Sequence, residues 1–439
     1  MNAFDRINKV IDFLKSKKTQ DLYKTKENAF IRKSKLMFLD LCLLFLFKKG
    51  LTNSMELNNY FFLNKLEEAA SKQAFSTKRQ LLNPDVFIEA NNEYVKSVYK
   101  RDDIKLFKNK YLVLAIDGVV GEIPNTAKLR EIFGDDGRKD QTNVARTRNS
   151  ALYDCLNHVM VSFNINGYKS AERELAKDNI IEGRKILGDS FPFLIIQDRG
   201  YPSIEMFGFH EKMGNKYIIR LQDNTYNAEI NSMKSNDEIL ELKINHNRLL
   251  GVKDPKEKKR LLNKGSIKVR VVKVVLDNGE IELLATNLTK EEISVSELKE
   301  MYFKRWGIET AYEILKNKLH IENVSGKSEI AVRQDYYATF LAFNMMEDIK
   351  NDANKGVTRN IDNGNQYDYK VNTNILVGSM KLCLIAILLE EDPLKAEKLQ
   401  KNMMKMVQRE LVAIVPDRSY PRKPYTGKNK HRLNMRRNS

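Results

Sequence analysis

The chain has 439 residues, a mass of 51.0 kDa and 30% charged side chains, which is enough for two or three domains with substantial cores. Its net charge of +17 and its isoelectric point near 9.4 predict a polyanionic partner. The three cysteines lie far apart and the five histidines lack ligand spacing, which argues against a disulfide framework and a zinc site.

The first part of the chain, residues 1–105, has the periodicity of amphipathic helices. Apolar side chains such as Phe4, Ile7 and Ile11 recur three and four residues apart, with polar residues between them. This pattern predicts a small helical domain with basic faces.

The most apolar run, residues 36–47, is shorter than a bilayer span and is interrupted by Asp40. We expect a core helix there and no membrane association. The start of the chain also lacks the apolar segment and cleavage site of a secretory signal, which favours a cytoplasmic protein.

Residues 71–84 could form two short helical pieces around a turn. In that arrangement Gln73, Lys78 and Arg79 would face outward, where such side chains read base edges or bind phosphates. A solvated basic helix has the same pattern, so both interpretations stay open.

From residue 108 the pattern changes to short apolar strands that alternate with helices, which predicts a mixed α/β domain. Two strands, 111–116 and 191–197, each lead directly into an aspartate, Asp117 and Asp198. Functional residues of open α/β sheets lie at the carboxyl ends of strands, although a strand-end Asp can also serve only as a turn former. Asp223, after a later strand, is the obvious decoy.

The same section contains further elements with simple signals. Ser203 can cap a helix that follows it. The predicted elements are strands at 151–153, 158–164 and 216–221, helices at 169–187 and 204–213, and a mobile loop at 135–148.

Residues 224–292 read as a β-rich insertion. Strands at 267–276 and 281–285 flank the turn signal Asp-Asn-Gly at 277–279, which predicts a hairpin. Residues 254–264 are expected to be a charged loop.

A single helix is predicted over residues 302–316, with Ser296 as a possible N-cap. At about 100° per residue, Tyr302, Arg305, Glu309 and Lys316 share one face of it. Such a face suits a metal-binding carboxylate among phosphate-binding cations, but a solvated face with i,i+4 ion pairs looks the same.

Beyond this helix the pattern is again helical. Apolar periodicity covers residues 332–346, a polar loop follows at 350–370, and a further helix covers 373–390. Residues 418–439 carry eight Lys or Arg and no acid, which predicts a tail that is disordered when free and available to a nucleic-acid backbone.

These motifs together give the chain a resemblance to a known family. It resembles the DDE transposases of bacterial insertion sequences, in the insertion sequence 4 family, whose signature is Tyr, Arg, Glu and Lys with two, three and six residues between them. The residues that carry the resemblance are Tyr302, Arg305, Glu309 and Lys316, the R-W-x-I-E context at 305–309, the D-R-G-Y at 198–201, and the I-D-G at 116–118.

The resemblance implies an α/β fold with an RNase H-like catalytic core, a mainly β insertion and helical flanks. The implied parts are a helical DNA-binding domain at 1–105, the core at 106–223 and 293–350, the insertion at 224–292, a helical region at 351–417 and the basic tail at 418–439.

It also implies the chemistry. Asp117, Asp198 and Glu309 would bind two Mg²⁺ ions, with Mn²⁺ as a substitute, and Tyr302, Arg305 and Lys316 would contact transposon-end phosphates. Trp306 is a candidate for stacking on a flipped base, although packing in the core or orienting Arg305 is the favoured interpretation. Glu313 lies one turn beyond Glu309, and helix geometry alone does not exclude it as the third ligand.

The implied function is cut-and-paste transposition of an insertion sequence, by strand cleavage, hairpin formation and strand transfer on double-stranded DNA. The partners would be the terminal repeats, the target DNA and a second copy of the chain in a paired-end complex, in a bacterial cytoplasm at the nucleoid. Two alternatives remain, a metal-dependent nuclease that does not join strands and a DNA-binding remnant that no longer catalyses.

Overall fold

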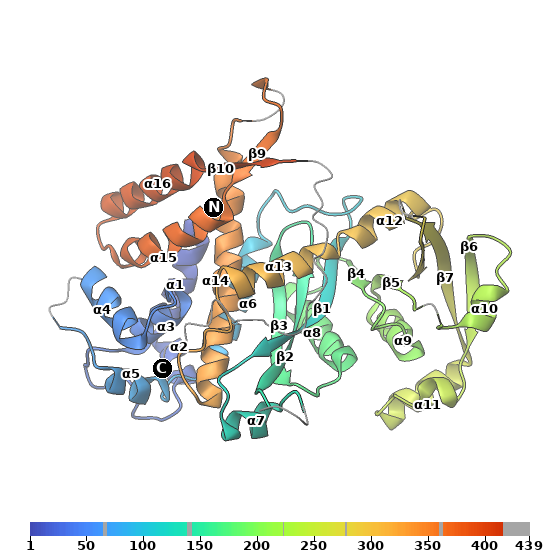
Figure 1. Ribbon diagram of the computed structural model, residues 1–439, viewed down its shortest axis with the longest axis horizontal. Helices are drawn as coiled ribbons and strands as arrows, with labels where there is room; N and C mark the ends of the chain where they lie inside the picture. The colour runs from blue at the N-terminus through green and yellow to red at the C-terminus, as the bar shows by residue number, and fades with distance from the viewer. Residues whose placement is uncertain (65–67, 138–142, 223, 277–278, 360–362, 416–439) are drawn as a thin grey trace. The chain divides into compact units, whose positions relative to one another are not determined.

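The computed structural model describes residues 1–64, 68–137, 143–222, 224–276, 279–359 and 363–415. They form two compact units, each assembled from separate stretches of the chain (Figure 1). A helical unit contains residues 1–101, 121–147 and 313–439, and an α/β unit contains residues 102–120 and 148–312.

The α/β unit is organised by one eight-stranded sheet, with strand order β3-β2-β1-β4-β5-β8-β7-β6. β1, β4 and β5 pair in parallel, whereas β5, β8, β7 and β6 pair antiparallel. The strands are β1 (Leu112–Glu122), β2 (Arg146–Asp154), β3 (Val159–Gly167), β4 (Phe193–Gln197), β5 (Lys216–Arg220), β6 (Asp237–Lys243), β7 (Ser266–Val275) and β8 (Ile281–Thr286).

β4 lies in the middle of this sheet, and every one of its residues is buried. A continuous apolar run is what a parallel strand covered on both faces requires, so β4 forms where the sequence predicts it. The helices of this unit are α8 (Glu172–Leu187), α9 (Ile204–Met213), α10 (Asn227–Asn231), α11 (Pro255–Lys264), α12 (Val295–Phe303) and the first half of α13 (Trp306–Asn317). The prediction of a mixed α/β fold flanked by helical segments is confirmed.

The β-rich section continues the same sheet, because β8 pairs with β5. The predicted hairpin forms from β7 and β8, while its turn residues 277–278 lie outside the described part of the chain. The expectation of a charged loop at 254–264 is wrong. Asp254 accepts a hydrogen bond from the Lys256 amide and Pro255 opens α11, which together are an ordinary helix start.

The predicted loop at 135–148 is only partly correct. Asp135 forms an isolated bridge with Ala145, and β2 already begins at Arg146. Residues 138–142 are outside the described residues, so the expectation for them stays a prediction.

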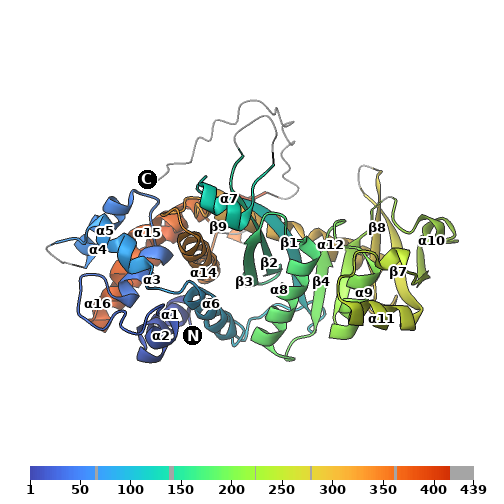
Figure 2. The same ribbon diagram turned by 90° about the horizontal axis from the view of Figure 1, so that it is seen from below.

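The helical unit is built around α14, a 27-residue helix over Glu329–Lys355, and Figure 2 shows it among α3, α6 and α15. The predicted core helix is α3 (Phe38–Leu46), with buried Leu and Phe side chains. The other helices are α1 (Ala3–Lys15), α2 (Lys17–Tyr23), α4 (Asn53–Leu63), α5 (Lys72–Arg79), α6 (Asp85–Val98), α7 (Ala127–Phe133), α15 (Thr373–Leu389) and α16 (Pro393–Arg409).

Buried ion pairs fix α14 against the N-terminal helices. Arg6 of α1 bonds Asp348 at 2.6 Å, and the Tyr94 hydroxyl donates to the same carboxylate at 2.7 Å. Because an unpaired buried charge is costly, these contacts specify how α1 and α6 pack on α14.

Toward the end of the chain the predicted helix at 373–390 is confirmed as α15, whereas the predicted loop at 350–370 is only partly correct. α14 continues to Lys355, and a two-stranded sheet pairs β9 (Asp368–Val371) with β10 (Leu411–Ile414). The helix α16 was not predicted. None of the helices in the described ranges is both long and apolar enough to cross a membrane.

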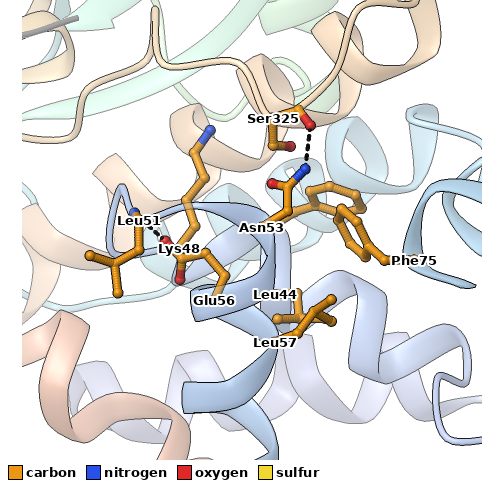
Figure 3. A pocket seen from close by; sticks show the side chains of 9 residues that line it. Leu44, Lys48, Leu51, Asn53, Glu56, Leu57, Phe75 and Ser325 are labelled. Atoms are coloured by element: carbon orange, nitrogen blue, oxygen red, sulfur yellow. Dashed lines mark hydrogen bonds between the residues drawn. The ribbon is translucent and has the colours of Figure 1, made fainter. Parts of the chain in front are cut away.

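A small cavity of about 20 Å³ lies within the helical unit, among α3, α4 and α5 (Figure 3). It has room for about one water molecule. Asn53 donates a hydrogen bond to the Ser325 carbonyl beside it, and Leu44, Leu57 and Phe75 line its apolar side.

Candidate active site

Two aspartates of the α/β unit are brought together by strand register. β1 and β4 pair in parallel from Leu112 opposite Phe193 to Ala115 opposite Ile196. The same register continued by two residues places Asp117 opposite Asp198, and neighbouring strands lie about 4.8 Å apart.

The prediction that the first strand ends at Asp117 is wrong, because β1 runs on to Glu122. Its pairing with β4 nevertheless stops at Ala115, and β4 itself ends at Gln197. Asp117 and Asp198 therefore lie at the carboxyl end of β4, the position at which open α/β sheets carry function.

Asp117 is half-buried, and its carboxylate accepts a hydrogen bond from the Gly118 amide at 2.8 Å. Burial raises the pKa of the Asp117 carboxyl to about 6; the charges of Glu309 and Asp198 act in the same direction, and Arg305 acts against them. The three predicted carboxylates therefore share one electrostatic environment, in which like charges repel one another.

The residues of the Tyr-Arg-Glu-Lys signature do not lie on one continuous helix, so that prediction is corrected. α12 ends at Phe303 and α13 begins at Trp306. Between them the chain makes tight turns, with the Arg305 amide bonded to the Tyr302 carbonyl at 3.0 Å. The angles of an ideal helix therefore do not apply across this junction.

The start of α12 also differs from the prediction. Ser294, not Ser296, is the N-cap, and Glu297 completes a capping box with it. Glu297 accepts a hydrogen bond from the Ser294 amide and so stabilises the first turn of α12. The N-cap therefore lies two residues earlier than predicted.

The junction places two signature side chains against the carboxylates. The Tyr302 hydroxyl donates a hydrogen bond to Asp198 Oδ1 at 3.2 Å, and Arg305 Nη1 pairs with Glu309 Oε1 at 2.8 Å. Asp198 and Glu309 are thus bonded to side chains from the end of α12 and from the turn that follows it.

Arg305 is only 4% exposed, which excludes a simple solvated ion pair. Its guanidinium lies 5.0 Å from the ring of Trp306 and 5.9 Å from that of Tyr302. Its Nε atom has no hydrogen-bond partner among the described residues. Arg305 is therefore a buried cation that lies against Glu309 and two aromatic rings.

Trp306 is 40% exposed, so its ring does not belong to the core. Its contact with the Arg305 guanidinium fits the expectation that it orients that side chain. The stacking role on a flipped base stays a prediction.

The remaining predicted DNA contacts belong to the helical unit. Lys316 pairs with Glu322 at 3.4 Å, and Lys78 is half-buried near the ring of Phe30. The expectation that Arg79 faces outward is wrong. It is 2% exposed and bonded to the Gln334 side chain, because an arginine beside the buried acids of α14 packs inward.

Glu309 and Glu313, the two candidates for the third acid, differ in their surroundings. Glu309 pairs with Arg305 and contributes to the raised pKa of Asp117. Glu313 is exposed and belongs to the helical unit. The surroundings favour Glu309 as the third acid.

Three residues that sequence reasoning missed lie at the same sheet edge. Tyr312 donates to the Asp117 carbonyl at 2.8 Å, and Tyr201 is 2% exposed. Glu172 lies against Gly118. Tyr312 could have been found from its spacing, three residues after Glu309, and Tyr201 from the D-R-G-Y motif, but Glu172 has no local signal.

The donor set fits a hard divalent cation, because carboxylate oxygens are the ligands that Mg²⁺ prefers. Two buried polar atoms, Tyr201 Oη and Arg305 Nε, have no partner among the described residues. As they stand, no three acidic, histidine or cysteine side chains in the described ranges are gathered closely enough to hold an ion.

Comparisons with known proteins are consistent with this chemistry. The profile of the family described as "Transposase DDE domain" matches residues 108–345. A Synechocystis sp. protein named as a transposase for insertion sequence element IS4SA is 28% identical over 154 residues, covering 34% of this chain and 38% of its own length. The transposase for insertion sequence element IS421 of Escherichia coli is 33% identical over 108 residues, covering 23% and 29%.

The chain thus spans less than half the length of these curated relatives. Among solved structures, a piggyBac transposase synaptic complex with hairpin DNA aligns with 93% of this chain and 86% of its own, at 10% identity and a TM-score of 0.44. The family profile covers more than half of the chain and includes Asp117, Asp198 and Glu309. The chain belongs to the transposases that carry a DDE domain.

Proposed function

We propose that this protein is a DNA transposase that moves an insertion sequence by metal-dependent strand cleavage and strand transfer. The observation that supports the proposal is the parallel pairing of β1 and β4, which ends just before Asp117 and Asp198, together with the influence of Glu309 on the Asp117 carboxyl. Three acids from separate segments, beside a buried arginine, suit phosphoryl transfer.

In this proposal Asp117, Asp198 and Glu309 hold two Mg²⁺ ions, for which Mn²⁺ can substitute. When bound, such ions activate the attacking oxygen and stabilise the leaving oxygen of a phosphodiester. Arg305, once released by Glu309, is placed to neutralise a phosphate, and Tyr302 can change its hydrogen bond from Asp198 to a phosphate oxygen.

In the proposed reaction sequence, one active site carries out successive phosphoryl transfers. Water cuts one strand at each element end and leaves a 3′-hydroxyl. That hydroxyl attacks the opposite strand, which closes a hairpin on the element end and releases the flanking DNA; water reopens the hairpin. The 3′-hydroxyl then attacks a target phosphodiester, and each step exchanges one P–O bond for another.

The proposed partners are the terminal repeats of the element, the target DNA and a second copy of the chain in a paired-end complex. Lys316 and Lys78 are further candidates for phosphate contacts. The net charge of +17 supports binding to the phosphate backbone of both the terminal repeats and the target DNA.

The test is cleavage of a labelled duplex that carries the element's own end, with Mg²⁺ or with EDTA, for the wild type and Asp198→Asn. We expect nicked, hairpin and joined products that need the metal. The Asp198→Asn variant should lose them by at least about 10³-fold, because it removes one ligand oxygen charge from the site while keeping its shape.

The products of this cleavage assay, together with binding of the same labelled duplex, distinguish the alternative functions. Cleavage without joined products would identify a nuclease and contradict transposition. Binding of the element end without a cut in either protein would favour the DNA-binding remnant.

A further inference from the structure

A fourth acid, Glu172, lies at the carboxyl end of β4 beside the two aspartates. It is the first residue of α8, and its carboxylate packs against the backbone that follows each aspartate. A Cβ atom added at Gly118 would lie 3.2 Å from Glu172 Oε1, and one added at Gly200 would lie 3.8 Å from Oε2. Gly118 directly follows Asp117, and Gly200 comes two residues after Asp198.

Gly118 leaves space that the Glu172 carboxylate fills, whereas a Cβ atom at Gly200 would make only an ordinary contact with it. A side chain at Gly118 would force this carboxylate to move, because 3.2 Å is closer than an ordinary van der Waals contact. The side chain of Glu172 is 37% exposed, so it is accessible from solvent as well as from the site.

In the structure Glu172 is held by Arg148. Arg148 Nη1 pairs with Glu172 Oε1, and its Nε donates to the Tyr168 carbonyl at 3.1 Å. Arg148 is therefore also held by the Tyr168 carbonyl, and this hydrogen bond can keep its position when Glu172 moves away.

A second observation points to a ligand at the same spot. The Tyr201 hydroxyl is buried and has no hydrogen-bond partner among the described residues. Tyr201 lies in the turn that follows Asp198, because its amide donates to the Asp198 carbonyl at 3.1 Å. Burial raises the pKa of the Tyr201 phenol well above its usual value, and the charges of Asp117, Glu172 and Asp198 act in the same direction. A buried hydroxyl without a partner is destabilising, and a ligand with bound water would supply one.

We propose that Glu172 is a fourth carboxylate of the metal site and that the Tyr201 hydroxyl bonds into the same site. Glu172 would bind a divalent cation or one of its water molecules from the first turn of α8. A fourth negative charge brings a site with two doubly charged cations closer to neutrality. This inference rests on the proposed function, because it assumes that Asp117 and Asp198 bind the cations.

The test measures metal binding rather than DNA cleavage. Trp306 is the chain's single tryptophan and adjoins Arg305, so excitation of its indole should sensitise the luminescence of Tb³⁺ bound at the site. Displacement of Tb³⁺ by Mg²⁺ then gives the Mg²⁺ affinity of the full-length protein.

We expect Glu172→Gln to weaken Mg²⁺ binding about tenfold. The matched control is Glu174→Gln, on the same first turn of α8, whose carboxylate pairs with Lys177 at 2.7 Å instead. Its Mg²⁺ affinity should equal that of the wild type.

Arg148→Gln distinguishes a ligand from a structural ion pair. Both Glu172→Gln and Arg148→Gln break the same pair, so an equal loss of Mg²⁺ affinity in the two variants would overturn the inference. Unchanged or tighter Mg²⁺ binding in Arg148→Gln, with weaker binding in Glu172→Gln, supports it.

Asp117→Asn separates this inference from the proposed function. If Asp117→Asn abolishes the Tb³⁺ signal while Glu172→Gln binds Mg²⁺ like the wild type, the fourth carboxylate is wrong and the three-acid site stands. If Asp117→Asn also binds like the wild type, the proposed metal site itself fails, and the inference fails with it.

Discussion

At the scale of single residues, the third acid is the assignment that a mutation tests most directly. Glu309 pairs with the buried Arg305, whereas Glu313 is exposed one turn later. Removing a charge that holds a catalytic cation costs several kcal/mol of transition-state stabilisation. We therefore expect Glu309→Gln to lower the cleavage rate by at least about 10³-fold and Glu313→Gln to change it less than about threefold.

The measurement is the single-turnover rate of element-end cleavage at saturating protein, with end binding measured in parallel. Equal end binding by the two variants shows that the effect is on chemistry. A cleavage rate that survives Glu309→Gln and is lost in Glu313→Gln would reassign the third ligand.

The residues of this site differ in how far the sequence could predict them. Asp117, Asp198 and Glu309 follow from the motifs that carry the family resemblance, which are local signals, although β1 runs on past Asp117. Glu172 could not be predicted, because only the β1–β4 register and the packing of α8 bring it to the aspartates. Arg79 was misjudged for the same reason, since its buried partners on α14 lie more than 250 residues away.

At the scale of elements, the end of β4 depends on α9. His210 of α9 is fully buried, and its Nε2 lies 2.9 Å from the side-chain oxygen of Gln197, the residue before Asp198. Burial lowers the pKa of His210 from 6.5 to about 3. The imidazole therefore stays neutral when folded at a pH at which the unfolded chain takes up a proton.

This difference sets the direction of a pH effect on stability. Above pH 6.5 neither state protonates His210, so its contribution to stability is complete. As the pH falls from 6.5 toward 3 only the unfolded state gains the proton, and the free energy of unfolding decreases by about 1.4 kcal/mol per pH unit. We expect His210→Gln to remove this slope.

Denaturant titrations at pH 7, 6 and 5 measure the effect as the difference between wild type and variant. His246→Gln is the matched control, because His246 is exposed and should leave the wild-type slope unchanged. Parallel pH profiles for the wild type and His210→Gln would contradict the assignment.

The elements were predictable where one pattern dominates. The buried strand β4 and the cap of α9 by Ser203 depend on local apolarity and capping. The break between α12 and α13 was missed, since residues 302–316 contain no proline and read as one helix. The charged composition of α11 is also typical of a loop, whereas its N-cap Asp254 and the proline at its first position indicate a helix.

At the scale of the whole molecule, each unit combines stretches that are distant in the chain. The helical unit joins α1 to α14 through Arg6 and Asp348, which are 342 residues apart. Division of a sequence into consecutive segments cannot represent such a unit, because hydrophobic periodicity contains no information on which distant helices pack together. The functional subdivision proposed from the sequence therefore stays a prediction.

The charge of the whole molecule predicts how it binds DNA. Residues 418–439 lie outside the described residues, but their eight Lys or Arg account for eight of the +17 net charges and leave +9 on residues 1–417. Each phosphate neutralised contributes about 0.9 to the slope of log K against log salt. If all eight basic residues of the tail contact phosphates, deletion of residues 418–439 should lower this slope by about 7 on non-specific duplex DNA, and by about 0.9 less for each that does not.

Fluorescence anisotropy of a labelled duplex between about 50 and 200 mM salt measures the slope. The control is a full-length variant in which the eight basic residues are replaced by Gln, which keeps the length of the tail and removes its charge. The two proteins should share the reduced slope, since counterion release depends on charge and not on chain length. An unchanged slope in both would mean that the phosphates are bound by the remaining +9 charges of the folded units alone.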